Sequence, residues 1–299
     1  MVDAFLDSMY GHQQASLFNG HYGCERYLPY GIRVRTESGQ QSLVYTRLRQ
    51  GTAGATDELE GALEGIVTRL RTHNPKAQII LRGDAAYGCD TVLRLCHALQ
   101  IDYLLAIPAN SRLDALFELL HSCVIFQREQ FKQGLISAEK FQERLYDSGL
   151  YRAASWEQAE RVVCRPYYDE SRRRLDARYV ICSMDMDPQD AYETYCGRCE
   201  CENRWKEMKL YIKSGRTSCT RFLANRFRLL LHHAAYALIQ VLRQHLRGTQ
   251  LAKASVETLR AKLLKTAVLV RRTQRSVTWR LPMHNPYEWA WRRLYARLA

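Results

Sequence analysis

Residues 191–213 read AYETYCGRCECENRWKEMKLYIK, and we predict that they form one helix that carries the chemistry of the chain. Successive residues of an α-helix are rotated by about 100° around its axis. On that geometry four polar side chains fall on one stripe roughly 60° wide, those of Tyr195, Arg198, Glu202 and Lys209. A core helix would place apolar side chains on such a stripe, and a solvated helix would scatter its charges. The pattern therefore favours a face that binds a metal ion beside a phosphate group.

The sequence before this helix alternates between strand and helix patterns. Residues 77–88 read AQIILRGDAAYG and contain an apolar run that is typical of a buried strand and that leads into Arg82, Gly83 and Asp84. A helix is predicted over residues 89–100 and a second strand over residues 101–110. Strand–helix–strand alternation predicts an α/β layer with parallel strands.

The remaining elements complete an α/β prediction. Short strands are expected at residues 1–7, 27–36 and 39–45, and an amphipathic helix at residues 56–73. Residues 112–148 are predicted to be helical, and residues 150–183 to form two antiparallel strands joined near Glu170. We predict four segments: residues 1–111 as the first part of the catalytic core, 112–187 as an α+β insertion subdomain, 188–250 as the glutamate helix with the following long helix, and 251–299 as a C-terminal extension.

The charge of the chain points to a polyanionic partner. The 299 residues include 44 Lys and Arg against 31 Asp and Glu, which gives a net charge of +13. Nucleic acid is the commonest partner of such a protein, although an ordinary basic protein is the alternative. The sequence has no apolar run of the roughly 18 residues that a membrane span needs, so we expect no membrane partner.

Three acids stand at positions where a metal site can form. Asp3 lies in the first strand, Asp84 follows a buried strand, and Glu202 lies on the late helix. Carboxylates at the carboxyl ends of strands suit Mg²⁺ or Mn²⁺, and two such ions about 4 Å apart can clamp a phosphodiester. Each acid also has a simpler interpretation: solvation for Asp3, a turn or N-cap for Asp84, and surface ion pairs for Glu202.

The spacing Tyr195-x2-Arg198-x3-Glu202-x6-Lys209 resembles the signature of bacterial insertion-sequence DDE transposases. The segments LRGDAAYG, YLLAIPANSRL and GHQQASLFNGHYGCERYLPY are also similar to stretches of that family, and the resemblance covers nearly all of the chain. It implies an RNase H-like mixed sheet flanked by helices, with the α+β insertion placed between the last core strand and the glutamate helix.

The resemblance also implies roles for individual residues. Asp3, Asp84 and Glu202 would be catalytic and would bind Mg²⁺ or Mn²⁺ in a two-metal site. Tyr195, Arg198 and Lys209 would contact DNA, and the basic surface would continue through Arg216 and Arg221. Water would attack the transposon end, and the freed 3′-OH would then attack target DNA. The implied partners are double-stranded DNA, both transposon ends and target, and a second copy of the chain in a homodimer on DNA. A bacterial cytoplasmic location beside the nucleoid is expected.

The sequence departs from the family near Asp3. The family places Thr two residues after the first aspartate, but here Phe5 stands at that position, and Asp7 is the fallback metal ligand. The chain starts at this strand, whereas family members carry a DNA-binding region before it, so a truncated copy is expected. The alternatives are an inactive remnant that still binds DNA or a partner and, third, another RNase H-like nuclease.

The C-terminal segment is rich in arginine and tryptophan. It contains Arg271, Arg272, Arg275, Arg280, Trp279, Trp289 and Trp291. Basic and aromatic side chains together can grip DNA. An apolar closing element with a solvated basic rim is the alternative, and the sequence leaves both open.

Overall fold

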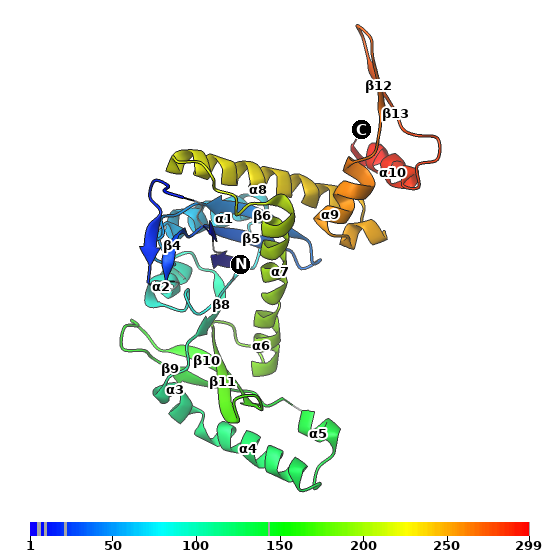
Figure 1. Cartoon of the computed structure of the whole chain (residues 1–299). Helices are drawn as coiled ribbons and strands as arrows, with labels where there is room; N and C mark the ends of the chain where they lie inside the picture. Colours follow the sequence, from blue (N-terminus) through cyan, green and yellow to red (C-terminus); the bar gives the residue numbers. More distant parts are fainter. Residues whose placement is uncertain (5–6, 9–10, 21–22, 143, 299) are drawn as a thin grey trace. The chain divides into compact units, whose positions relative to one another are not determined.

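The computed structural model describes the chain except residues 5–6, 9–10, 21–22, 143 and 299, and it also leaves the side chains of 8, 142, 199–202 and 298 undescribed. The chain divides into two compact units (Figure 1). Unit 1 comprises residues 1–4 and 53–201, and unit 2 comprises residues 5–52 and 202–299. The boundary therefore falls inside the stretch that was predicted to be a single helix.

Unit 1 contains a five-stranded mixed sheet of strand order β7-β8-β11-β10-β9. Its strands are β7 (Ile80–Gly83), β8 (Asp102–Ile107), β9 (Asp147–Tyr151), β10 (Glu160–Asp169) and β11 (Arg174–Cys182). Strands β7 and β8 pair in parallel, with Ile80 opposite Asp102 and Gly83 opposite Leu105. The predicted parallel pair is confirmed, and so is the α/β class. The RNase H-like topology stays a prediction.

The antiparallel hairpin predicted in residues 150–183 is confirmed as β10 and β11, and it extends this same sheet. β11 pairs with β8 so that Tyr179 lies opposite Ile107. Val162, Val163 and Cys164 of β10 are all buried. A strand buried on both faces needs covering on each side, which explains why this apolar run lies inside a sheet.

Unit 1 also contains the helices α1 (Leu59–His73), α2 (Asp90–Ala98), α3 (Ser111–Leu116), α4 (Glu118–Lys132), α5 (Ala138–Gln142) and α6 (Pro188–Cys196). Of these helices, α4 contacts β10 and α6 contacts β8 to β11 of the sheet, and the short strand β1 (Val2–Ala4) contacts β7. Ala191 and Tyr192 of α6 pack on a core formed by Leu104, Val163, Val180 and Cys182. This packing fixes α6 to the sheet and so positions the end of α6, where Tyr195 lies.

The predicted single helix over residues 191–213 is divided into three helices. Helix α6 begins after the N-cap Asp187, whose carboxylate accepts a hydrogen bond from the Gln189 amide, and it ends at Cys196. Gly197 and Arg198 form a turn, and α7 (Cys199–Glu207) and the π-helix η1 (Met208–Ile212) follow. Glycine is a poor helix former, which gives a physical reason for the interruption. The prediction of one uninterrupted helix is wrong, so its rotation angles do not by themselves align Tyr195 with Lys209.

Unit 2 combines short antiparallel strands with a long helix. Its strands are β2 (Asp7–Ser8), β3 (Leu17–Asn19), β4 (Cys24–Tyr27), β5 (Tyr30–Arg35), β6 (Gln41–Arg47), β12 (Leu269–Arg272) and β13 (Val277–Arg280). Its helices after η1 are α8 (Phe222–His245), the 3₁₀-helix η2 (Gln250–Lys253), α9 (Val256–Leu259), the π-helix η3 (Arg260–Leu264) and α10 (Glu288–Leu298). Among the described residues, no helix has both the length and the apolar character that a membrane span requires.

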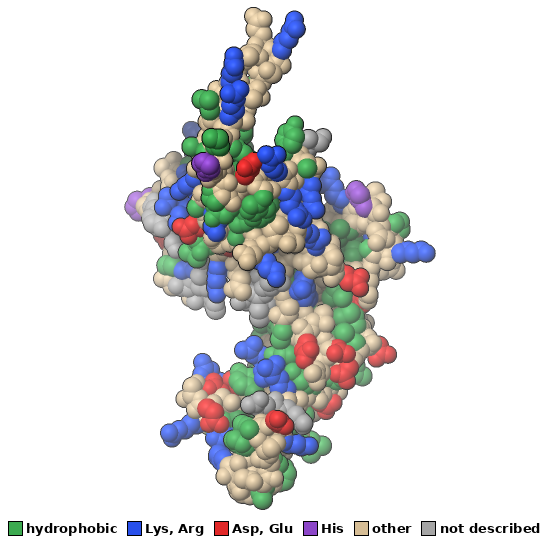
Figure 2. Space-filling model, turned by 90° about the vertical axis from the view of Figure 1, so that its right-hand side faces the viewer, with side chains coloured by type: hydrophobic (Ala, Val, Ile, Leu, Met, Phe, Trp, Pro, Cys, Tyr) green, Lys and Arg blue, Asp and Glu red, His purple; other side chains and the backbone are tan. Residues whose placement is uncertain are grey.

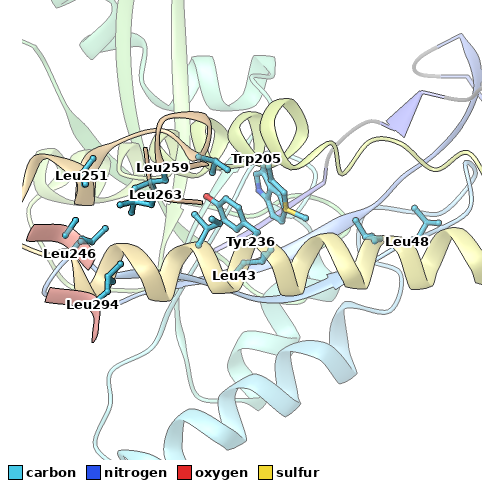
Figure 3. Close-up of a cluster of buried hydrophobic side chains, with 14 of the residues drawn as sticks. Leu43, Leu48, Trp205, Tyr236, Leu246, Leu251, Leu259, Leu263 and Leu294 are labelled. Carbon is cyan, nitrogen blue, oxygen red and sulfur yellow. The ribbon is translucent and has the colours of Figure 1, made fainter. Parts of the chain in front are cut away.

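The core of unit 2 forms along one face of α8 (Figure 3). Trp205 of α7 and Tyr236 of α8 lie near the middle of this core, which also contains leucines from β6, α9 and α10. The Arg33 guanidinium lies over both aromatic rings, 4.6 Å from the Trp205 ring centroid and 5.0 Å from that of Tyr236. The predicted long helix after the signature is therefore the main packing element of unit 2.

A buried carboxylate ties three helices of unit 2 together. Glu207, at the end of α7, accepts hydrogen bonds from Tyr236 Oη at 2.9 Å, from Arg243 Nη1 at 3.0 Å and from the Val256 amide at 3.1 Å. Burial alone would raise the pKa of Glu207, but Arg243, Tyr236 and Arg204 together hold that pKa below its usual value. Glu207 is therefore a charged structural link between α7, α8 and α9.

Candidate functional site

The first predicted acid is held by a predicted DNA-binding arginine. In unit 1, Arg198 Nη1 lies 3.4 Å from Asp3 Oδ2, and the two side chains are only 13% and 11% exposed. Asp3 lies in β1, whereas Arg198 lies in the turn after α6. The pair therefore joins the two segments, and the simple interpretation of Asp3 as a solvated terminal residue is wrong.

The second predicted acid follows β7 in a tight turn. Asp84 Oδ1 accepts a hydrogen bond from the Ala86 amide at 3.0 Å, and the Asp84 carbonyl accepts one from the Tyr87 amide at 3.0 Å. A Cβ at Gly88 would lie 2.2 Å from the Ala106 carbonyl oxygen, so this turn requires glycine. Asp84 thus has the turn role that the sequence left open, and that role is compatible with metal binding through the same carboxylate.

The environment of Tyr195 connects Arg198 with Asp84. Burial raises the pKa of its phenol, the neighbouring Arg198 lowers it, and the charge of Asp84 raises it. Arg82 Nη1, on β7, donates a hydrogen bond of 2.7 Å to the Thr194 carbonyl oxygen and so ties the end of α6 to the strand that precedes Asp84. Four of the predicted site residues therefore gather in unit 1: Asp3, Asp84, Tyr195 and Arg198.

The third predicted acid is at the boundary between the two units. Glu202 lies on α7 and is the first residue of the second segment of unit 2, but its side chain lies outside the described residues. Lys209 lies on η1 with an exposed side chain. Arg216 and Arg221 lie in the loop before α8, and both are exposed. These cations face solvent, where phosphate groups can reach them.

Asp7, the fallback ligand, belongs to unit 2 and is 1% exposed. Neither of its carboxylate oxygens has a hydrogen-bond partner among the described residues. Burial raises the pKa of Asp7 to about 6, although Thr217 and Lys209 lie close enough to lower it. A Cβ at Gly215 would lie 3.3 Å from Asp7 Oδ1 and 3.4 Å from Lys209 Cε, so this glycine packs between the two side chains.

The sequence prediction missed the polar residues buried with Asp7. Gln13 donates a hydrogen bond to the Thr217 carbonyl oxygen, and the Thr217 hydroxyl is itself buried without a partner among the described residues. The segments that contain Gln13 and Thr217 are about 200 residues apart and share no periodic pattern. Only the fold brings them together.

The donor atoms in unit 1 suit a hard divalent cation. Asp3 and Asp84 supply carboxylate oxygens, which Mg²⁺ and Mn²⁺ prefer. Over the described part of the chain, no group of three or more His, Cys, Asp or Glu side chains could hold a metal ion. The predicted set would be completed by Glu202, whose side chain is not described. The two aspartates therefore supply the type of ligand atom that Mg²⁺ and Mn²⁺ prefer.

Comparison with known proteins places the chain in a family. The model of the transposase DDE domain group 1 matches residues 2–299. No curated protein matches the chain. The matched range includes every residue of the predicted site, from Asp3 to Arg221. The chain belongs to the transposase family defined by the DDE domain of group 1.

Proposed function

We propose that the chain catalyses metal-dependent cleavage of transposon-end DNA and transfer of the cleaved strand to target DNA. The observation that supports this most is the grouping of Asp3, Asp84, Tyr195 and Arg198 in unit 1 of a DDE-family transposase. Two carboxylates, a cation and a phenol linked by these interactions are groups that can bind metal ions and phosphate in phosphodiester chemistry.

The carboxylates of Asp3 and Asp84, together with Glu202, would hold Mg²⁺ or Mn²⁺, with Asp7 as the alternative to Asp3. When bound, two such ions stabilise the negative charge on the attacking and leaving oxygens of a phosphodiester. Oxygen-only donors favour these hard cations over zinc, which prefers nitrogen and sulfur ligands.

The cationic and phenolic side chains would bind and orient the DNA. Arg198 and Lys209 would contact phosphate oxygens by charge-assisted hydrogen bonds, and Arg216 and Arg221 would extend that contact. A tyrosine phenol ordinarily has a pKa near 10 and keeps its proton at neutral pH, and burial raises the pKa of Tyr195 further in that direction. Its hydroxyl can therefore donate a hydrogen bond to a phosphate oxygen throughout the reaction.

Both reaction steps exchange one bond to phosphorus for another. In cleavage, water forms the new P–O bond, the bond to the 3′ oxygen breaks, and that oxygen leaves as a 3′-OH after taking up a proton. In strand transfer, this 3′-OH attacks a target phosphodiester and releases a target 3′-OH. No oxidant or energy donor is needed. The homodimer on DNA stays a prediction.

A second candidate function is DNA binding without chemistry. It is favoured by the ion pair between Arg198 and Asp3, which already neutralises the carboxylate without a metal ion. Metal-dependent cleavage separates the two functions, because only the enzyme needs its carboxylates as ligands.

The experiment compares Asp84→Asn with Asp190→Asn on duplex DNA that carries the terminal sequences of the element. Asp190 is an exposed acid in the first turn of α6, so its substitution makes the same chemical change in unit 1 outside the site. We expect the wild type and D190N to cut in Mg²⁺ or Mn²⁺ and D84N to bind without cutting. Cleavage by D84N at the wild-type rate would contradict the metal-ligand role, and binding without cleavage by the wild type would favour the second candidate.

A further inference from the structure

The C-terminal hairpin β12–β13 extends from unit 2 as a two-stranded ribbon (Figure 1). All eight of its strand residues are exposed. For the hairpin, this exposure excludes the closing-element interpretation, because a closing element would bury its apolar side chains. Trp279 is 65% exposed, and Leu269, Val270 and Val277 are each more than half exposed. The α10 part of the same C-terminal segment does pack, since Trp291 lies against the core of unit 2.

An exposed ribbon of two strands has little stability of its own in water. Here the turn supplies local order. The Thr273 amide donates a hydrogen bond of 2.9 Å to the Ser276 carbonyl oxygen, and the Ser276 amide donates one of 3.1 Å to the Thr273 hydroxyl. A ribbon whose turn is already ordered loses less entropy when a partner binds it.

The strand register gives the ribbon two different faces. Leu269 pairs with Arg280 and Arg271 with Thr278, while Val270 pairs with Trp279 and Arg272 with Val277. Directly paired residues share a face and successive pairs alternate. One face therefore presents Arg271 and Arg280, and the other presents Trp279 with two valines and Arg272. The turn between the strands contains Arg275.

The charge of the ribbon identifies the chemistry of its partner. Between Lys265 and Tyr287 the sequence contains four arginines and no Asp or Glu. Figure 2 shows Lys and Arg side chains along the projecting hairpin. A second copy of this ribbon would bring like charges together, whereas a polyanion would neutralise them. The major groove of duplex DNA admits a two-stranded β-ribbon, and most protein contacts to DNA are with phosphates and sugars.

We propose that the β12–β13 hairpin is a DNA-binding arm that enters the major groove of duplex DNA. Arg271, Arg275 and Arg280 contact phosphates along the groove, and Trp279 with its neighbouring valines covers apolar surface of the groove wall. The inference rests on the proposed function, since it names a second contact between this chain and its DNA substrate, separate from the residues of the catalytic site.

The test measures duplex binding by the full chain without divalent metal, at several salt concentrations. The variant Arg271→Gln/Arg275→Gln/Arg280→Gln is compared with Arg94→Gln/Lys132→Gln/Arg292→Gln. The control removes three positive charges from exposed helix surfaces, where the residues pair with Asp90, Glu129 and Glu288. A plot of log K against log salt has a negative slope, and each phosphate contact contributes about 0.9 to its steepness. We therefore expect the slope of the hairpin variant to be less steep by about 2 to 3. Its affinity should fall at least about tenfold relative to the control.

Equal slopes and affinities for the two triple variants would overturn the proposal. A loss of self-association in the hairpin variant, with DNA binding unchanged, would also overturn it and would identify the partner as a second copy of the chain. Because the assay contains no metal, its result is independent of cleavage. Failure of cleavage alone would count against the proposed function, while failure of the hairpin variant to weaken binding would count against the arm.

Discussion

Arg198 and Asp3, 195 residues apart in the sequence, form a nearly buried ion pair, with Arg198 Nη1 3.4 Å from Asp3 Oδ2. The pair joins the first strand to the turn after α6. It also means that a predicted metal ligand and a predicted phosphate contact are direct neighbours. A cation that binds Asp3 must therefore compete with Arg198 for the same carboxylate.

Replacing Arg198 should strengthen metal binding and weaken DNA binding. In Arg198→Gln, the Asp3 carboxylate loses a competing positive charge, so we expect half-maximal cleavage at a lower Mg²⁺ concentration. DNA binding should weaken at the same time, because a phosphate contact is lost. Cleavage rates measured against Mg²⁺ and against DNA show both effects, and Arg198→Lys, which keeps the charge, should lie between. An unchanged Mg²⁺ requirement would show that Arg198 does not compete at Asp3.

The carboxyl group of Asp7 should make unit 2 less stable as the pH rises. Its pKa is raised from 3.8 to about 6 by burial, so the folded state binds the proton more tightly than the unfolded state. The contribution of Asp7 is therefore fully present below about pH 4 and is lost as the pH rises through about 6. Relative to Asp7→Asn, the wild type should lose up to about 3 kcal/mol over that range.

Urea unfolding of both proteins at several pH values measures this difference. Comparison with the Asn variant removes the contribution of every other titrating group. A constant difference in unfolding free energy from about pH 4.5 to 7.5 would show that Asp7 titrates normally in the folded chain.

Loss of the Glu207 charge should destabilise unit 2. Glu207→Gln leaves the buried Arg243 without its counter-charge, and breaking a buried ion pair on one side costs about 3 kcal/mol or more. Glu257→Gln is the matched control, because Glu257 lies on the neighbouring helix α9 and is exposed. Thermal unfolding followed by circular dichroism should show a lower midpoint only for E207Q. Equal midpoints would mean that the hydrogen bonds of a neutral amide suffice.

Two glycines of unit 1 should respond in opposite directions to alanine. Gly88→Ala would place a Cβ 2.2 Å from the Ala106 carbonyl oxygen, so we expect it to destabilise the turn that carries Asp84. Gly61 lies on helix α1, and a Cβ there would meet no atom within 4 Å. Gly61→Ala should therefore stabilise unit 1 by up to about 1 kcal/mol, since alanine is the better helix former. Unfolding midpoints that move in the same direction would contradict this difference in packing.

Features that depend on local pattern could be predicted from the sequence. The apolar run before Asp84 predicted β7, and the strand–helix–strand pattern predicted its parallel pairing with β8. The break at Gly197 was missed because helical periodicity continues across it, and a single glycine only weakens a helix. The environment of Asp7 could not be predicted, since it depends on Gln13 and Thr217, which only the fold brings together.

The exposure of the C-terminal hairpin could not be predicted from its sequence, for a different reason. Its composition predicted either DNA contact or a buried closing element, because arginine and tryptophan suit both. The exposure of Trp279 and its neighbours in β12 and β13 depends on what the remaining helices leave uncovered. Exposure of this kind is a property of the whole unit and not of the segment.

We propose that Glu202 is a ligand of the catalytic metal ions. The most direct test of this proposal is Mn²⁺- or Mg²⁺-dependent cleavage of DNA that carries the element's ends, with Glu202→Gln and Glu193→Gln compared with the wild type. Glu193 is an exposed acid on α6 that accepts a hydrogen bond from Gln189, so E193Q makes the same change outside the site. We predict that E193Q cuts like the wild type, while E202Q binds the DNA but does not cut it. Cleavage by E202Q at the rate of the wild type would contradict the role of Glu202 as a metal ligand.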